Sequence, residues 1–98
     1  MIAHFDHFES LWEACEKHHQ ENKGDTSVLM LINELVMKLN LYNALEQRTE
    51  LTNDERHASK SRIMGEILLA LTHLSLKDNI NVFDTLNTAL QYRISPRV

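Results

Sequence analysis

The chain has 98 residues, a net charge of -4 at pH 7, two glycines, one proline and one cysteine. This length predicts one domain with a modest core, and the acidic balance argues against binding to nucleic acid or to an anionic membrane. The single cysteine excludes a disulfide within the chain and is typical of a reducing compartment. We find neither a secretory leader pattern nor a run near the roughly 20 apolar residues of a membrane span. A soluble, cytoplasmic, all-α protein is therefore expected.

Apolar residues at helical spacing predict four helices, the first over residues 6–21. We expect residues 22–25 to end this helix, with Gly24 in the left-handed conformation that closes many helices. Asp25 or Thr26 should then cap the next helix. The packing side of the first helix consists of Phe5, Phe8, Trp12, Cys15 and His19.

The second predicted helix, residues 26–46, carries apolar residues on two opposite sides. Glu34 and Lys38 separate the two sides along one border, and three asparagines separate them along the other. A helix that packs once needs one apolar side, so this helix either runs through the middle of the domain or meets another subunit. The first stripe is Val28, Ile32, Leu35, Leu39 and Tyr42. The second stripe, which we expect to form an oligomer interface, is Met30, Met37, Leu41 and Ala44, with Leu45 at its margin.

A polar connector over residues 47–62 precedes the packing part of the third helix. Thr52 and Glu55 have the spacing of a capping box, so the third helix begins there or, alternatively, near Ser59. Residues 77–79 should end it, and Asn81 should cap a fourth helix that ends before the proline. The stripe of the third helix is Ile63, Ile67, Ala70, Leu71 and Leu74, and that of the fourth is Val82, Phe83, Leu86, Ala89 and Leu90.

Carboxylates and histidines are the residues to weigh for chemistry. His4 and His7 are one turn apart and could share a metal, but no third ligand of obvious spacing completes a site. Glu34 and Glu66 each interrupt an apolar segment, and antiparallel packing of their helices would bring both toward a common inner surface. The simpler interpretation is that Glu34 pairs with Lys38 one turn later and that Glu66 is a border residue beside His73. His19 lies near the end of the first helix, where the helix dipole and solvent exposure account for a histidine. Cys15 should pack as a small apolar side chain.

The segments Leu31-Ile32-Asn33-Glu34-Leu35-Val36-Met37 and Ile63-Met64-Gly65-Glu66-Ile67-Leu68 resemble the two metal-binding motifs of MazG-like all-α nucleoside triphosphate pyrophosphohydrolases. The resemblance spans residues 28–93. It implies a MazG-like fold in which carboxylates hold the magnesium that binds the triphosphate and activates water. Only Glu34 and Glu66 match the acids of these motifs. Asn33, Met37 and Ile63 stand where the family has carboxylates.

The helical pattern, the surplus apolar stripe and the resemblance together predict a compact four-helix, MazG-like protein that forms homo-oligomers through the second helix. Its expected role is a binding or assembly module with weak or no nucleotide hydrolysis, because a thioether is a poor ligand for a hard cation. One alternative is a magnesium-dependent pyrophosphohydrolase that uses Glu34 and Glu66 as catalytic and metal-binding residues. A second alternative is an adaptor whose methionine-rich groove binds an amphipathic partner helix.

Overall fold

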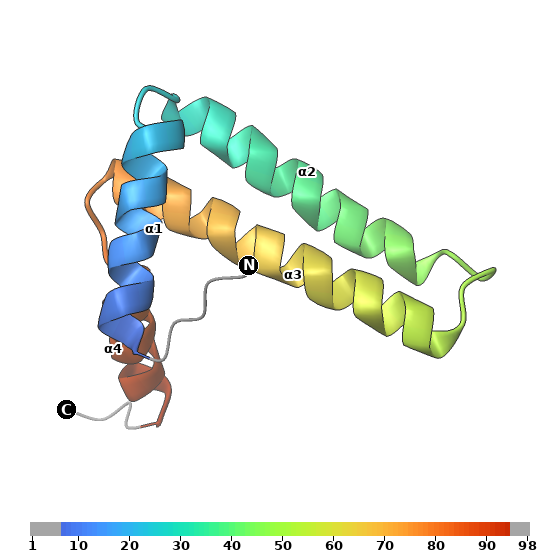
Figure 1. Ribbon diagram of the computed structural model, residues 1–98. Coiled ribbons are helices and arrows are strands. Elements are labelled where there is room, and N and C mark those ends of the chain that lie inside the picture. Colours follow the sequence, from blue (N-terminus) through green and yellow to red (C-terminus); the bar gives the residue numbers. More distant parts are fainter. Residues whose placement is uncertain (1–6, 95–98) are drawn as a thin grey trace.

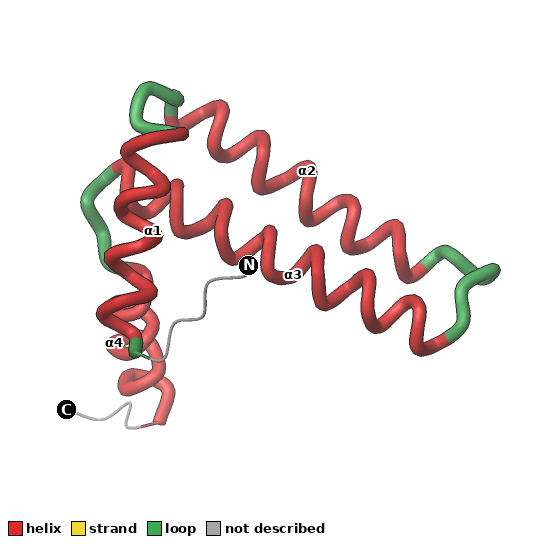
Figure 2. The backbone as a smooth tube through the Cα atoms, viewed as in Figure 1, coloured by secondary structure: helices red, strands yellow, loops and turns green. Residues whose placement is uncertain are grey.

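The computed structural model describes residues 7–94, and every regular element in that range is an α-helix (Figures 1 and 2). The predicted number of helices is confirmed, and the predicted ends lie within two residues of the observed ones. α2 and α3 lie side by side and antiparallel as a long hairpin (Figure 1). α1 crosses this hairpin at the end where α2 begins and α3 ends, and α4 continues from the same end (Figure 1). The bounds are α1 (Phe8–Asn22), α2 (Val28–Glu46), α3 (Asn53–Lys77) and α4 (Val82–Ile94).

Side-chain caps fix where three of the helices begin. The hydroxyl of Thr52 accepts from the backbone N–H of Glu55 at 3.1 Å, and the Glu55 carboxylate accepts from the Thr52 N–H at 2.9 Å. This confirms the capping box and the earlier of the two predicted starts of α3. Asn81 caps α4 as predicted, since its side-chain oxygen accepts from the Phe83 N–H at 2.9 Å. The cap of α2 is Ser27 rather than Asp25 or Thr26.

The connection from α1 to α2 closes without a left-handed glycine, so the prediction for Gly24 is wrong. The C-cap of α1 is Lys23 at φ -129°, and its backbone N–H donates to the carbonyl of His19 at 2.7 Å. The Lys77 ammonium donates to the Gly24 carbonyl at 2.8 Å and ties this loop to the end of α3. The residue with positive φ is Asn79, at 57°, in the turn between α3 and α4.

The side of α2 that packs against α3 is the border between its two apolar stripes, where Glu34 and Lys38 lie. Leu31, which is 1% exposed, lies at the centre of this contact, and Leu35 and Tyr42 are half-buried beside it. The rest of the first stripe is exposed, as are Met30, Met37, Leu41 and Ala44 of the second. The option that α2 runs through the middle of its own domain is therefore wrong.

The apolar core of the described residues is small. The apolar side chains that are buried there are those of Leu31, Ile63, Ile67 and Ala70. The radius of gyration is 16.0 Å, whereas about 12.6 Å is usual for a compact domain of this length. The accessible surface is 7810 Å², whereas about 5800 Å² is usual for a folded monomer of this mass. The prediction of an all-α protein with four helices is confirmed, but the described chain is less compact than expected, because the hairpin projects from α1 and α4 (Figure 1).

Candidate functional site

Glu34 and Glu66 form ion pairs with lysines from different parts of the chain. The Glu34 carboxylate lies 3.3 Å from the Lys23 ammonium, which comes from the loop before α2. The Glu66 carboxylate on α3 lies 3.9 Å from the Lys38 ammonium on α2. The predicted Glu34–Lys38 pair within α2 is therefore wrong, because Lys38 reaches across the hairpin instead. Each of the two carboxylates is therefore paired with a lysine ammonium from outside its own helix.

This arrangement does not fit a magnesium site. Magnesium requires near-octahedral oxygen ligands, and a lysine ammonium beside each carboxylate repels a divalent cation. Between residues 7 and 94, no group of three or more His, Cys, Asp or Glu side chains is arranged to hold a metal ion. Ile63, at the place of a motif acid, is 8% exposed and belongs to the contact between α2 and α3. The residues present thus supply two separate ion pairs rather than a ligand set.

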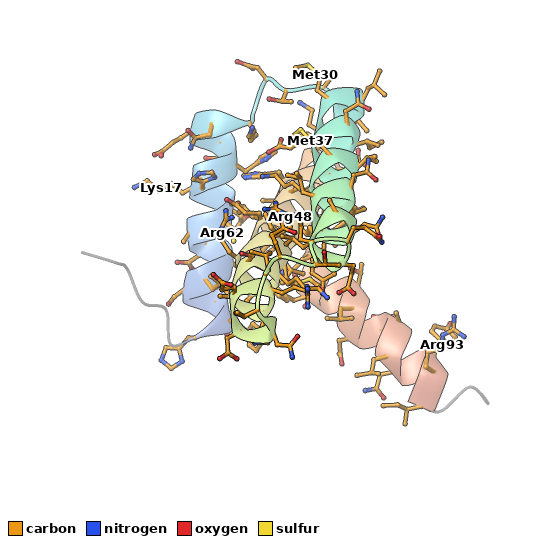
Figure 3. All side chains as sticks on the ribbon, turned by 90° about the vertical axis from the view of Figure 1, so that its right-hand side faces the viewer. Lys17, Met30, Met37, Arg48, Arg62 and Arg93 are labelled. Carbon is orange, nitrogen blue, oxygen red and sulfur yellow. The ribbon has the colours of Figure 1, made fainter. Side chains whose placement is uncertain are left out.

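The second stripe of α2 is exposed on the side of the hairpin turned toward α1. Met30 and Met37, which are 62% and 55% exposed, lie along that side (Figure 3). The neighbouring positions on α3 are charged, since Arg62 borders Leu41 in a shallow hollow and Glu66 follows one turn later. Leu45 is half-buried. The second stripe, which the sequence predicts as an interface, is therefore accessible to solvent, and its apolar residues come from α2 alone.

The opposite side of the hairpin carries exposed apolar residues on both helices, together with the charged pair of Lys60 and Glu46. Lys60 of α3 lies 5.1 Å from the centroid of the Tyr42 ring and pairs with Glu46, which fixes this side of the contact. Met64 lines the same hollow as Tyr42 and Lys60. By helical register, the exposed residues of the first stripe lie on this side of α2. We call this surface the lateral face: Val28, Ile32 and Leu39 of α2 with Met64 of α3, each 38–47% exposed.

A buried histidine pair joins α1 to α3. The Nδ1 atoms of His19 and His73 lie 3.2 Å apart, and the side chains are 8% and 2% exposed. The His18 ring centroid lies 5.1 Å from that of His73. Burial lowers the pKa of both His19 and His73 below the ordinary value, and the neighbouring positive charges lower it further.

His19 is buried, as its place on the predicted packing side of the first helix indicates, and the account of it by solvent exposure at the end of α1 is wrong. The placement of His73 at a border is also wrong. One sequence signal could have found the pair. His19 continues the apolar stripe of α1 after Cys15, and His73 follows the buried Ala70 by three residues. Both positions are thus on the packing sides of their helices.

A groove of about 510 Å³ lies between α1, α3 and α4. Cys15 lines this groove and is half-buried, as expected for a small apolar side chain, and burial raises the pKa of its thiol. Gly65 also lines it, and a Cβ added there would meet nothing within 4 Å. The rings of Phe8 and Trp12 pack against Phe83 at centroid distances of 5.3 and 5.7 Å, which holds α4 beside α1.

α2 is long and apolar enough to cross a membrane by length and composition, although the sequence was expected to contain no such segment. Core helices of soluble proteins and signal sequences satisfy the same criterion. Glu34 and Lys38 lie in the middle of this helix, on the side that packs against α3. In hydrocarbon each of these charges would cost roughly 2.5–3.5 kcal/mol on an insertion scale.

Comparisons with protein-family models, with curated proteins and with solved structures find no match to this chain. The resemblance to MazG-like proteins consequently rests on the sequence pattern, which includes the order of the helices and the two segments around Glu34 and Glu66.

Proposed function

We propose that this protein is a self-associating helical module, in which two copies pair through their lateral faces, and that it has weak or no nucleotide hydrolysis. The observation that carries this proposal is the apolar surface that continues from α2 onto α3. Exposed apolar patches of this kind mark interfaces far more often than free surface in soluble proteins. Pairing two hairpins would place four helices around a shared core, which would give each chain buried apolar contacts that a single copy lacks.

The thin core of a single copy supports the same proposal. Four buried apolar side chains are few for the stretch from residue 7 to residue 94, and apolar burial is the main favourable term in folding. The accessible surface exceeds the usual monomer value by about 2000 Å², which is more than the roughly 800 Å² that each partner buries in a standard interface. One standard interface with a second copy would therefore cover less than half of the excess, so a second copy supplies part of the missing burial.

The lateral face suits a second copy better than the second stripe does. Its neighbours on α3 are Met64 and Lys60, whose charge is already paired with Glu46, whereas those of the second stripe are Arg62 and Glu66. A charge placed in the centre of an interface must be desolvated, which opposes association. The adaptor alternative would use the second stripe, with a partner helix lying along Met30 and Met37.

Weak or absent hydrolysis is proposed because the two matching carboxylates are already paired with lysines. A cytoplasmic location is proposed because α2 carries mid-helix charges and a row of asparagines, which oppose insertion into a bilayer. The MazG-like ancestry remains a hypothesis that neither proposal requires.

Sedimentation velocity on two matched variants tests the interface. Leu39→Glu and Met37→Glu both place a carboxylate on α2 at exposed apolar positions two residues apart, 47% and 55% exposed. We expect dimers for the wild type and for Met37→Glu, and monomers for Leu39→Glu at micromolar concentration. The reverse pattern would assign the interface to the second stripe, and a monomeric wild type would contradict self-association altogether.

An assay of pyrophosphate release from the common nucleoside triphosphates, with magnesium or manganese, tests the second part of the proposal. We expect rates near background. Robust turnover that Glu34→Gln or Glu66→Gln abolishes would establish the pyrophosphohydrolase alternative instead. Flotation with lipid vesicles addresses location, since a membrane-inserted α2 would carry the protein into the lipid fraction.

A further inference from the structure

The contact between His19 and His73 is unusual because both partners titrate. Their Nδ1 atoms lie 3.2 Å apart between α1 and α3, and both rings are buried. The rings are stacked, with centroids 5.4 Å apart and an interplanar angle of 28°. A single hydrogen bond between two imidazoles requires one Nδ1 to carry a proton and the other to present a lone pair.

The surroundings select one tautomer for the neutral pair. The Nε2 atom of His73 is buried and has no hydrogen-bond partner. An unpartnered lone pair is tolerated better in a protein interior than an unpartnered N–H. His73 therefore donates from Nδ1–H to Nδ1 of His19, and Nε2 of His73 stays unprotonated.

Protonation of both rings removes this bond. Once each imidazole carries two protons, both Nδ1 atoms are donors and face one another at hydrogen-bond distance. Neither ring can reach water without moving, because the side chains are 8% and 2% exposed. Two adjacent buried positive charges are opposed both by their mutual repulsion and by desolvation.

The charged groups that face the pair do not compensate for these charges. His18 comes from α1, Lys23 from the loop after it and Lys77 from the end of α3, and each lowers the pKa of one or both histidines. Glu34 of α2 acts in the opposite direction on His73, but its carboxylate already lies 3.3 Å from the Lys23 ammonium.

We propose that the His19–His73 contact is a pH-sensitive latch, which holds α1 against α3 at neutral pH and releases α1 in mild acid. This inference rests on the contact itself and does not depend on the proposed self-association. The connection of residues 23–27 would serve as the hinge, since it joins α1 to the hairpin. Release would uncover the apolar groove, whose α1 side includes Leu11 and Cys15.

The direction of the pH effect follows from the histidines being neutral when α1 is docked. A group with a lowered pKa in the docked form contributes its full stabilisation above the free value of about 6.5 and loses it as the pH falls. If opening takes up two protons, the opening equilibrium rises by up to about 100-fold per pH unit, and by about tenfold if it takes up one.

Hydrogen exchange of the full-length protein between about pH 7.5 and about pH 5 measures this opening. After correction for the intrinsic exchange rates, we expect amides of α1 to lose protection by more than tenfold per pH unit below about pH 6.5. Amides around Ile63 and Ile67 in the hairpin should keep their protection. The double variant His19→Gln/His73→Gln should abolish this dependence, and the exposed His57→Gln variant should retain it.

Two results would overturn the latch. One is a double variant in which the acid-induced exposure of α1 persists unchanged, and the other is a wild type whose α1 amides show no exposure beyond intrinsic chemistry. Should the double variant fail to fold, ¹⁵N spectra of the wild-type imidazoles decide the matter. The latch requires that His19 and His73 titrate together with the loss of α1 protection, and independent titration without that loss contradicts it.

Discussion

Gly65 lies in the interior of α3, and no neighbouring atom prevents a side chain at this position. A Cβ at this position would meet nothing within 4 Å. Glycine in a helix interior is unfavourable relative to alanine, because it loses more backbone entropy on folding. The residue therefore destabilises α3 without any contact in a single copy that compensates for it.

Replacing Gly65 with alanine should raise the free energy of unfolding by about 1 kcal/mol. Chemical denaturation measures this change, and Gly24→Ala provides the control. The Cβ of that variant would lie 3.1 Å from the carbonyl oxygen of Gln20, so it should bring no comparable gain. A loss of stability in Gly65→Ala would show that another molecule or segment approaches the α3 backbone at this point.

Neutralising either candidate carboxylate should have a small effect on stability. Glu34→Gln and Glu66→Gln each break one partly exposed ion pair with a lysine, and such pairs contribute about 0–1 kcal/mol. Magnesium should leave the melting temperature of the wild type unchanged, because the lysines occupy the space a cation would need. A rise in melting temperature with magnesium that disappears in either variant would show that these carboxylates do bind the cation.

At the scale of the helix, α2 shows how two stripes can be recognised and still be placed wrongly. The stripes lie on either side of the Glu34–Lys38 border, so the apolar residues indicate two sides of the helix and do not identify the side that faces α3. The structure places Leu31 at the centre of the contact. Lys38 can lie beside it because its long aliphatic stem packs while its ammonium reaches Glu66.

Truncation of neighbouring leucines in α2 should separate the packed side from the free side. Leu31→Ala should lower the free energy of unfolding by about 2–5 kcal/mol, as expected for a leucine whose removal leaves a cavity. Leu29→Ala, two residues earlier and 66% exposed, should change it by less than about 0.5 kcal/mol. Thermal and chemical denaturation give both values. Similar losses in the two variants would mean that the exposed side of α2 is also covered in solution.

The sequence predicted the helices and two of their caps because these depend on neighbouring residues. The capping box of Thr52 and the cap by Asn81 are local patterns with one structural solution. The histidine pair depends instead on a contact between residues 54 positions apart. Likewise, the pairing of Lys23 with Glu34 and of Lys38 with Glu66 follows from tertiary placement, so Glu34 and Glu66 could be named as candidates but not assigned partners.

For the whole molecule, the projecting hairpin and the small core have a thermodynamic signature. If copies pair through the lateral face, the melting temperature should rise with protein concentration, because association stabilises the folded state by mass action. Calorimetry over a range of concentrations measures the rise. Leu39→Glu should melt lower and independently of concentration, and a concentration-independent wild type would contradict the pairing.

The small core, with four buried apolar side chains in the described part of the chain, also bears on how long a lone copy survives in a cell. Chains with low stability spend more time open, and proteases degrade the open form. Pairing would protect each chain, so turnover would slow as synthesis rises and quicken as it falls. The abundance of this protein would then respond to its own production rate more steeply than in proportion, without any regulator beyond the exposed side of one helical hairpin.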